Sequence, residues 1–185
     1  EEYKALNSPV IEFHCSQKDM DIDFRGSSKE TQLVVHAPEI FDRKLVDVCS
    51  DNNDIIDGSI YLLQRAIDKT LEISKNFSSK KPKFVVHLGG MSLDHVVSEG
   101  NTSLMMERAV DNFKKLRFNS DDIDILPENL PPRPWYLGGQ WFQYGFMLAE
   151  DMIDFCKYFD LKMTYDICHA ALHCNHADIS LNEYT

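Results

Sequence analysis

The stretch Met163-Thr-Tyr-Asp166-Ile-Cys-His169-Ala170 carries the strongest structural and chemical signal in this chain. We interpret residues 162–167 as a buried strand, with Asp166 at its carboxyl end and His169 in the first turn beyond it. A carboxylate and an imidazole that converge at a strand end suit a divalent metal or a proton transfer. The alternative interpretation is a helix start, in which Asp166 is the N-cap and His169 lies in the first helical turn.

Four other short apolar segments predict further strands, and three longer segments predict helices. The strands are expected at residues 10–13, 32–38, 84–87 and 123–126. Apolar residues recur at every third or fourth position over residues 54–77, 105–118 and 146–156, as in amphipathic helices. Strands of consecutive apolar residues that alternate with helices are typical of a parallel sheet. The predicted fold class is therefore α/β, followed by an irregular tail over residues 172–185.

Size and composition limit the class of protein. The chain has 185 residues, 43% of them hydrophobic and 26% charged, which predicts one domain over residues 1–185. No apolar run approaches the ~20 residues of a membrane span, so no membrane partner is expected. The formal net charge of −11 argues against nucleic acid as a partner, because such binding needs clustered Lys and Arg. The five cysteines are odd in number and lack C-x-x-C spacing, which favours free thiols in a reducing cytoplasm.

Polar side chains follow most of the predicted strands. His36 and His87 hold matching positions at the ends of two valine-rich strands, and Glu128 and Asn129 follow the strand at 123–126. In parallel α/β folds the functional groups collect at the carboxyl ends of the strands. A carboxylate is costly to bury there unless it is paired or bound to a metal, and Asn129 could support it through a hydrogen bond. The alternatives are structural histidines at the rim of the core and an exposed loop carboxylate.

Two other segments have features of binding sites. Residues 130–140 hold three prolines, two glycines and Trp135, and stiff loops of this kind often lie over a binding site. The cysteines and histidines between Cys168 and His176 suggest a structural zinc site, but no second ligand pair at zinc-binding spacing occurs elsewhere. The chain has no G-x-G-x-x-G, Walker A or G-x-S-x-G motif, so a nucleotide-phosphate loop and a serine nucleophile are unsupported.

The chain resembles the xylose-isomerase-like TIM barrels in four segments, taken in order. These are Val-Val-His36-Ala-Pro, Val-Val-His87-Leu-Gly-Gly, Leu-Pro-Glu128-Asn129 and Tyr-Asp166-Ile-Cys-His169-Ala. This superfamily holds sugar and sugar-phosphate isomerases and epimerases together with AP endonucleases of the endonuclease-IV type. The resemblance covers residues 10–176 and does not separate these branches. It implies a (β/α) barrel with parallel strands, of which this chain accounts for about five to six of eight units.

In the isomerase branch, the resemblance implies that Glu128 is both a metal ligand and the catalytic acid/base. Asp166 would be a second ligand, and His169 would act on the substrate. The cofactor implied is a divalent metal, which is Mn, Mg, Co or Zn. We also expect Asn129 and Trp135 to contact a small-molecule carbohydrate substrate.

In the endonuclease branch, the resemblance implies a multi-zinc cluster that activates water against a phosphodiester. All five strand-end groups match its ligands, namely His36, His87, Glu128, Asp166 and His169. The retention of both strand-end histidines, which we include among the predicted metal ligands, keeps this branch open.

The resulting prediction is a cytoplasmic, metal-dependent sugar or sugar-phosphate isomerase or epimerase that moves a proton between adjacent carbons. It rests on the acidic charge and the lack of basic clusters near the strand ends. A zinc-dependent AP-endonuclease-like phosphodiester hydrolase is the first alternative, and a barrel-derived binding domain without turnover is the second. The first, seventh and eighth strands of a barrel, with their expected ligands, are not found, so we expect a partial barrel with an incomplete metal site. A homo-oligomer is left open.

Overall fold

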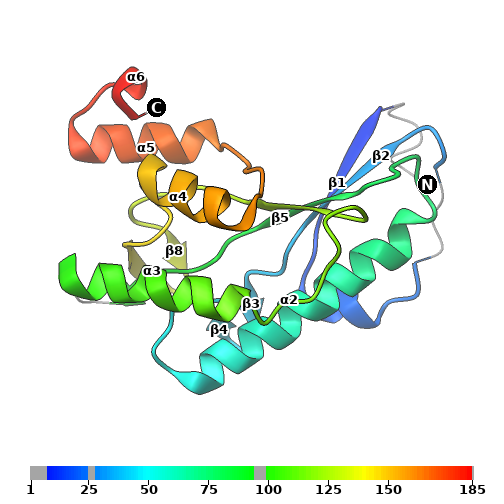
Figure 1. Cartoon of the computed structure of the whole chain (residues 1–185), viewed down its shortest axis with the longest axis horizontal. Coiled ribbons are helices and arrows are strands. Elements are labelled where there is room, and N and C mark those ends of the chain that lie inside the picture. The colour runs from blue at the N-terminus through cyan, green and yellow to red at the C-terminus, as the bar shows by residue number, and fades with distance from the viewer. Residues whose placement is uncertain (1–7, 25–27, 94–98, 185) are drawn as a thin grey trace.

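The centre of the protein is a parallel sheet, seen in a computed structural model that describes residues 8–24, 28–93 and 99–184. Four strands take the order β1-β2-β5-β7 (Figure 1). They are β1 (Val10–His14), β2 (Gln32–His36), β5 (Lys83–Val86) and β7 (Asp124–Pro127). All three pairings are parallel, so the four carboxyl ends lie at one edge of the sheet. The prediction of a parallel α/β fold is confirmed, and these four strands lie where the apolar segments placed them.

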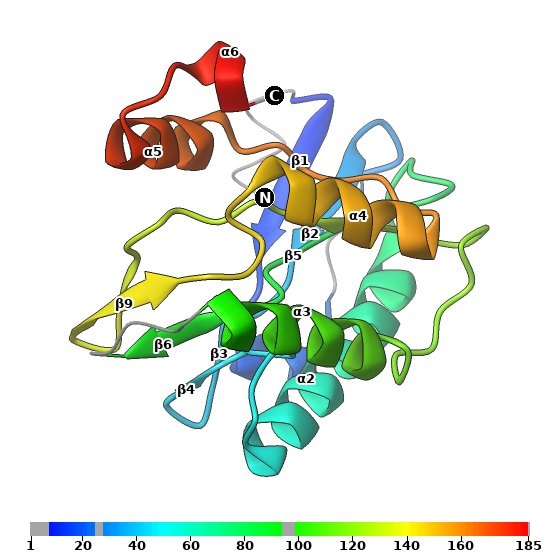
Figure 2. The ribbon, with the colours of Figure 1, turned by 60° about the vertical axis from the view of Figure 1, so that its left-hand side comes forward.

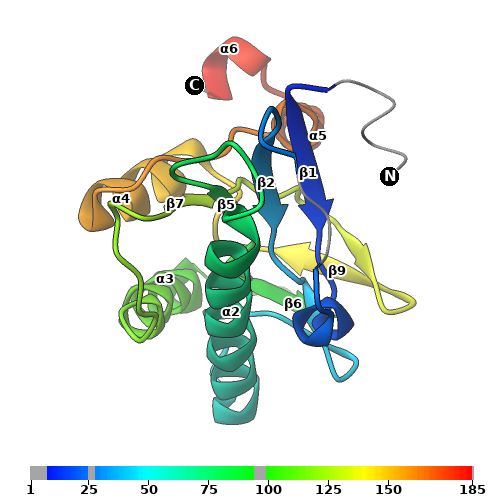
Figure 3. The ribbon, with the colours of Figure 1, turned by 90° about the vertical axis from the view of Figure 1, so that its right-hand side faces the viewer.

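Three helices flank the sheet along one side (Figure 3). They are α2 (Asn53–Ser74), α3 (Glu99–Phe113) and α4 (Ala149–Phe159). Consecutive strand residues such as Phe84, Val85 and Val86 are buried, as expected for a covered sheet. The predicted helix at 105–118 is displaced toward the N-terminus, since α3 begins at Glu99. The sequence pattern missed this start because Gly100 and Asn101 have low helix propensity and carry no apolar stripe. Helix α3 also stops at Phe113.

The predicted strand at residues 162–167 is wrong. Only Thr164 makes a parallel bridge, to Glu128, and the chain then turns at Asp166 into helix α5 (Ile167–Ala177). The expected irregular tail is wrong as well, since α5 is followed by α6 (Leu181–Tyr184). The side chain of Asp166 accepts a hydrogen bond from the His169 amide, and good helix formers follow it. The N-cap interpretation of this stretch therefore describes the backbone correctly.

The predicted stiff loop at 130–140 contains a hairpin. Strand β8 (Trp135–Tyr136) pairs with β9 (Gly139–Gln143), which also pairs with β6 (Met91–Leu93) beside the main sheet (Figure 2). Leu137 and Gly138 both have positive φ, as a tight two-residue hairpin turn requires. The hairpin therefore has a defined conformation at the edge of the site.

Three short elements complete the described fold. The 3-10 helix η1 (Gln17–Asp21) follows β1, and β3 (Ile40–Phe41) pairs with β4 (Lys44–Leu45) after β2. Within the described ranges, no helix combines the length and apolar character needed to cross a membrane.

Candidate metal centre

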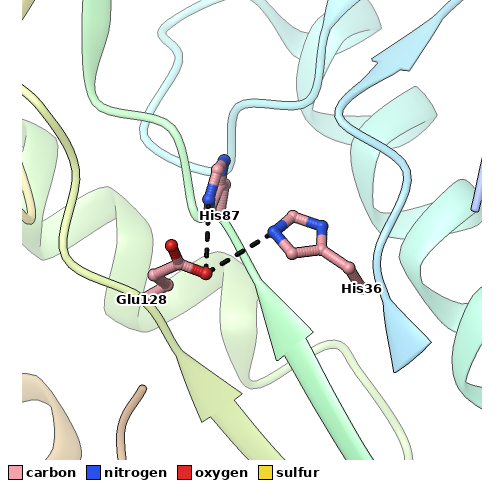
Figure 4. A group of neighbouring side chains, drawn as sticks. All are labelled: His36, His87 and Glu128. Atoms are coloured by element: carbon pink, nitrogen blue, oxygen red, sulfur yellow. Dashed lines mark ion pairs between the residues drawn. The ribbon is translucent and has the colours of Figure 1, made fainter. Parts of the chain in front are cut away.

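Three buried side chains converge where three neighbouring strands end. His36 is the last residue of β2, His87 follows β5, and Glu128 follows β7 (Figure 4). The Oε2 atom of Glu128 lies 3.5 Å from Nε2 of His36 and 3.6 Å from Nε2 of His87. The ligand atoms of these three residues lie close enough together to hold one metal ion. The sheet register thus brings together three residues that lie about 40 to 50 positions apart in the sequence.

The ring nitrogens of both histidines show which atoms are free to bind. Nδ1 of His36 lies 3.0 Å from the carbonyl oxygen of Ala37, and Nδ1 of His87 lies 3.0 Å from Oε1 of Glu39. Each Nδ1 therefore donates a hydrogen bond, which leaves Nε2 of the neutral ring as an acceptor. Two such acceptors that face a buried carboxylate need a proton or a cation between them. Among the described buried side-chain atoms, Nε2 of His87 is one without a hydrogen-bond partner.

The charges at this cluster are strongly coupled. Burial alone would lower the pKa of His87, but the carboxylates of Glu128 and Glu39 raise it to about 9. Burial alone would raise the pKa of Glu128, but His36 and His87 hold it well below its ordinary value. The carboxylate is therefore ionised at neutral pH and attracts positive charge. Two imidazoles and one carboxylate are a donor set that fits Zn²⁺, Co²⁺ or Mn²⁺.

Asp166 and His169 form a second group with the same glutamate. Nδ1 of His169 lies 3.4 Å from Oε1 of Glu128 and 3.9 Å from Oδ2 of Asp166, so these three could also hold an ion. In this structure Nδ1 of His169 lies 2.8 Å from the carbonyl oxygen of Asn129. That nitrogen is therefore occupied as a donor, and this group is less ready for an ion than the first.

Asn129 joins the two groups from inside the protein. It is fully buried; its Nδ2 donates to the carbonyl oxygen of Asp166 at 3.0 Å, and its Oδ1 accepts from the Asp166 amide at 2.7 Å. This pair of bonds continues the contact that the Thr164 amide makes with the carbonyl oxygen of Pro127. Asn129 thus holds the start of α5 against the end of β7. Its side chain was predicted to support the Glu128 carboxylate, but these two hydrogen bonds go to the backbone of Asp166 instead.

A cavity of about 540 Å³ opens over both groups. All five predicted ionisable residues line it, whereas Trp135 is 68% exposed and lies outside it. The neighbouring Tyr136 lines the cavity instead.

Among the cavity residues that sequence reasoning did not predict are Glu12, His14, Glu39 and Tyr136. The ring of His14 stacks on that of His36, with centroids 4.5 Å apart. A strand that ends in His, as the strands before His36 and His87 do, was a usable signal for His14. Glu39 and Tyr136 had no such signal, because they lie outside the parallel strands.

The turn beyond His87 is held from behind by Asp47. Its Oδ1 accepts hydrogen bonds from the amides of Cys49 and Gly90, at 2.8 and 2.9 Å. Burial raises the pKa of Asp47 to about 6 against these two bonds, which lower it. Gly89 has a φ of 89°, and a Cβ atom there would collide with the Asp47 carboxylate.

Comparison with known proteins identifies the fold. No family model matches the sequence, and no curated protein matches it. Among solved structures, a D-tagatose 3-epimerase-like protein matches with a TM-score of 0.62 and 18% identity, over 98% of this chain and 64% of its own. The chain therefore shares the TIM-barrel-like fold of this structure over the part that it covers. This partial barrel spans 64% of the length of that structure. A second structure, SacUVDE, matches with a TM-score of 0.47 and 14% identity, over 76% of this chain and 38% of its own.

Proposed function

We propose that this partial barrel is a metal-dependent isomerase or epimerase that acts on a small carbohydrate. One observation carries the proposal. Nε2 of His36 and Nε2 of His87 face the ionised Glu128, while the other nitrogen of each ring donates a hydrogen bond. Without an ion, a proton sits between the His87 ring and the carboxylate; a divalent cation can displace it and take these buried groups, already oriented by their other hydrogen bonds, as ligands.

The residues of the site take distinct roles in this proposal. His36, His87 and Glu128 hold the ion, with Asp166 as a further ligand. A bound divalent ion supplies a Lewis acid that polarises the carbonyl and hydroxyl oxygens of an open-chain sugar. Glu128 would also move the proton, accepting it from a substrate carbon and returning it to the neighbouring carbon. His169 lines the cavity with its Nδ1 fixed, and it orients the substrate hydroxyls.

The substrate class is inferred from the cavity and the comparison. A volume of about 540 Å³ is typical of a small-molecule site. The net charge of −11 disfavours a polyanion, and the structure with a TM-score of 0.62 is named for a sugar epimerase. Asn129 supports the site from behind, and Trp135 is the least supported of the predicted substrate contacts. The five free cysteines fit a reducing compartment, and we place the enzyme in the cytoplasm.

One observation favours the zinc-dependent phosphodiester hydrolase as a second candidate. Glu128 presents Oε2 to the two strand-end histidines and Oε1 to His169. A carboxylate shared in this way can bridge two ions, as in many phosphatases and nucleases. This candidate predicts that the protein binds more than one zinc ion and nicks abasic DNA.

Metal analysis combined with Glu128→Gln tests the proposal. We expect one Co²⁺ or Mn²⁺ per chain, and metal-dependent exchange of a sugar C–H proton with solvent, measured by NMR in deuterated water. Glu128→Gln should reduce this exchange at least ~100-fold, because it removes both the charge and the proton acceptor. Glu72→Gln, which alters an exposed carboxylate on α2, is the matched control.

The candidates are separated by the outcome. Two or more zinc ions with cleavage of abasic DNA would favour the hydrolase. A Glu128→Gln variant that folds normally and keeps biological activity would instead favour the binding domain without turnover.

A further inference from the structure

A chain of three side chains leads from the β8–β9 hairpin to the metal centre. Oε1 of Glu39 lies 3.0 Å from Nδ1 of His87, the ring nitrogen opposite the one that faces Glu128. The hydroxyl of Tyr136 hydrogen-bonds to the same Glu39 carboxylate. Glu39, His87 and Tyr136 all line the cavity, and none of the proposed steps uses Glu39 or Tyr136.

Both supporting residues are fixed by the backbone around them. The carbonyl oxygen of Glu39 accepts a hydrogen bond of 2.8 Å from the Val46 amide, and strand β3 begins at the next residue. The carbonyl oxygen of Tyr136 accepts a hydrogen bond of 3.1 Å from the Trp141 indole, across the hairpin. The backbone of each supporting residue is thus anchored by contacts within the protein.

The chemistry of the groups defines the direction of each hydrogen bond. A carboxylate oxygen accepts hydrogen bonds, so Nδ1–H of His87 donates to Oε1 of Glu39. The Tyr136 hydroxyl donates to the same carboxylate.

We propose that Glu39 is a positioning residue that fixes the Nδ1–H tautomer and ring plane of His87 for metal binding, and that Tyr136 holds Glu39 in place. This inference rests on the proposed metal site. A carboxylate behind a ligating imidazole orients the ring and makes it a stronger donor to the ion. His36 has only the carbonyl oxygen of Ala37 in the equivalent place. His87 is therefore the stronger of the two imidazole ligands, and the hairpin is linked to the metal through it.

Titration of the metal-free 185-residue chain with Co²⁺ tests the inference. Competition with a chelator gives the affinity, and the visible absorption spectrum of the bound Co²⁺ reports the geometry of its ligands. Glu39→Ala should weaken Co²⁺ binding about 10- to 100-fold and shift the absorption bands. Glu39→Gln keeps an acceptor for His87 and loses the charge, so its loss should be smaller. Tyr136→Phe should cause the smallest loss.

Matched controls separate positioning from general changes in the cavity. Glu12→Gln removes a carboxylate that lines the same cavity but pairs with His14, and Tyr165→Phe removes a hydroxyl there. Both should bind Co²⁺ like the wild type. Wild-type affinity and spectra in Glu39→Gln and Glu39→Ala would overturn the inference, as would an equal loss in Glu12→Gln. Should Glu39→Ala fail to fold, Glu39→Gln and Tyr136→Phe decide the matter. A wild-type chain that binds no Co²⁺ would overturn the metal site itself, and with it this inference.

Discussion

The two walls of the site are built in different ways. The strand-borne residues (His36, His87 and Glu128) lie at the ends of adjacent parallel strands, and their side chains are at most 10% exposed. The helix-borne residues (Asp166 and His169) lie at the start of α5, with side chains 32% and 22% exposed. Strand pairing brings the first set together, as the proposed ion site requires. The polar groups of the second set already make hydrogen bonds within the protein. Asp166 caps α5, and His169 donates to the carbonyl oxygen of Asn129. Metal affinity should therefore reside mainly in the strand-borne wall.

The largest expected effect compares one histidine from each wall. His87→Ala should weaken Co²⁺ binding about 100-fold or more, because a binding free energy of ~10 kcal/mol is shared among only a few ligands. His169→Ala should weaken it less than ~10-fold. Isothermal titration calorimetry of both variants checks this order. A loss in His169→Ala that equals or exceeds that in His87→Ala would contradict the comparison.

The second prediction concerns the residue that joins the walls. Asn129→Ala removes two hydrogen bonds to the Asp166 backbone and leaves buried polar groups unsatisfied, so it should lower the free energy of unfolding by about 2–3 kcal/mol. Urea denaturation of the metal-free protein measures this. Exposed Asn119→Ala on a surface turn is the control, with an expected change below ~1 kcal/mol. Equal losses in the two variants would mean that Asn129 does not hold the walls together.

The third prediction separates the two tasks of Asp166. Asp166→Ala should cost about 1 kcal/mol of unfolding free energy, because α5 loses its N-cap. Asp166→Asn keeps a capping oxygen, so it should be nearly as stable as the wild type while it still loses the charge available to an ion. Urea denaturation and Co²⁺ titration of both variants are needed. If Asp166→Asn is as unstable as Asp166→Ala, capping is not the source of the cost.

The smallest effect concerns the support behind the strand-borne wall. Folding raises the pKa of Asp47 from 3.8 to about 6, so the folded protein holds this proton more tightly than the unfolded chain. The proton on Asp47 therefore adds to the free energy of unfolding at low pH. This stabilisation is fully present below about pH 4 and is lost as the pH rises to about 6. Its size is on the order of 1 kcal/mol, because the carboxyl is partly exposed. In Asp47→Asn, the free energy of unfolding should no longer fall over this pH range. Urea denaturation between pH 4 and 7 measures the two slopes, and parallel curves would exclude Asp47 as their cause.

The parallel sheet and the strand-borne wall could be predicted from the sequence. Runs such as Phe84-Val-Val are apolar on both faces, and a polar residue directly after such a run must lie at the sheet edge. His36, His87 and Glu128 could be placed together for this reason. The same reasoning would have reached His14, which ends β1 opposite His36.

The way in which the other residues meet follows from tertiary packing. Residues 162–167 are apolar enough for a strand. In the structure, one bridge at Thr164 and the two hydrogen bonds from Asn129 take the place of strand pairing. The side chain of Asp166 then caps the helix that begins there. Glu39 and Tyr136 reach His87 from a loop and a hairpin, and neither position has a periodic signal. The pattern of apolar residues along a helix or strand shows which of its faces is buried, because side chains return to the same face with the period of that element. Contacts between distant loops depend on how the elements pack, and no local repeat encodes that.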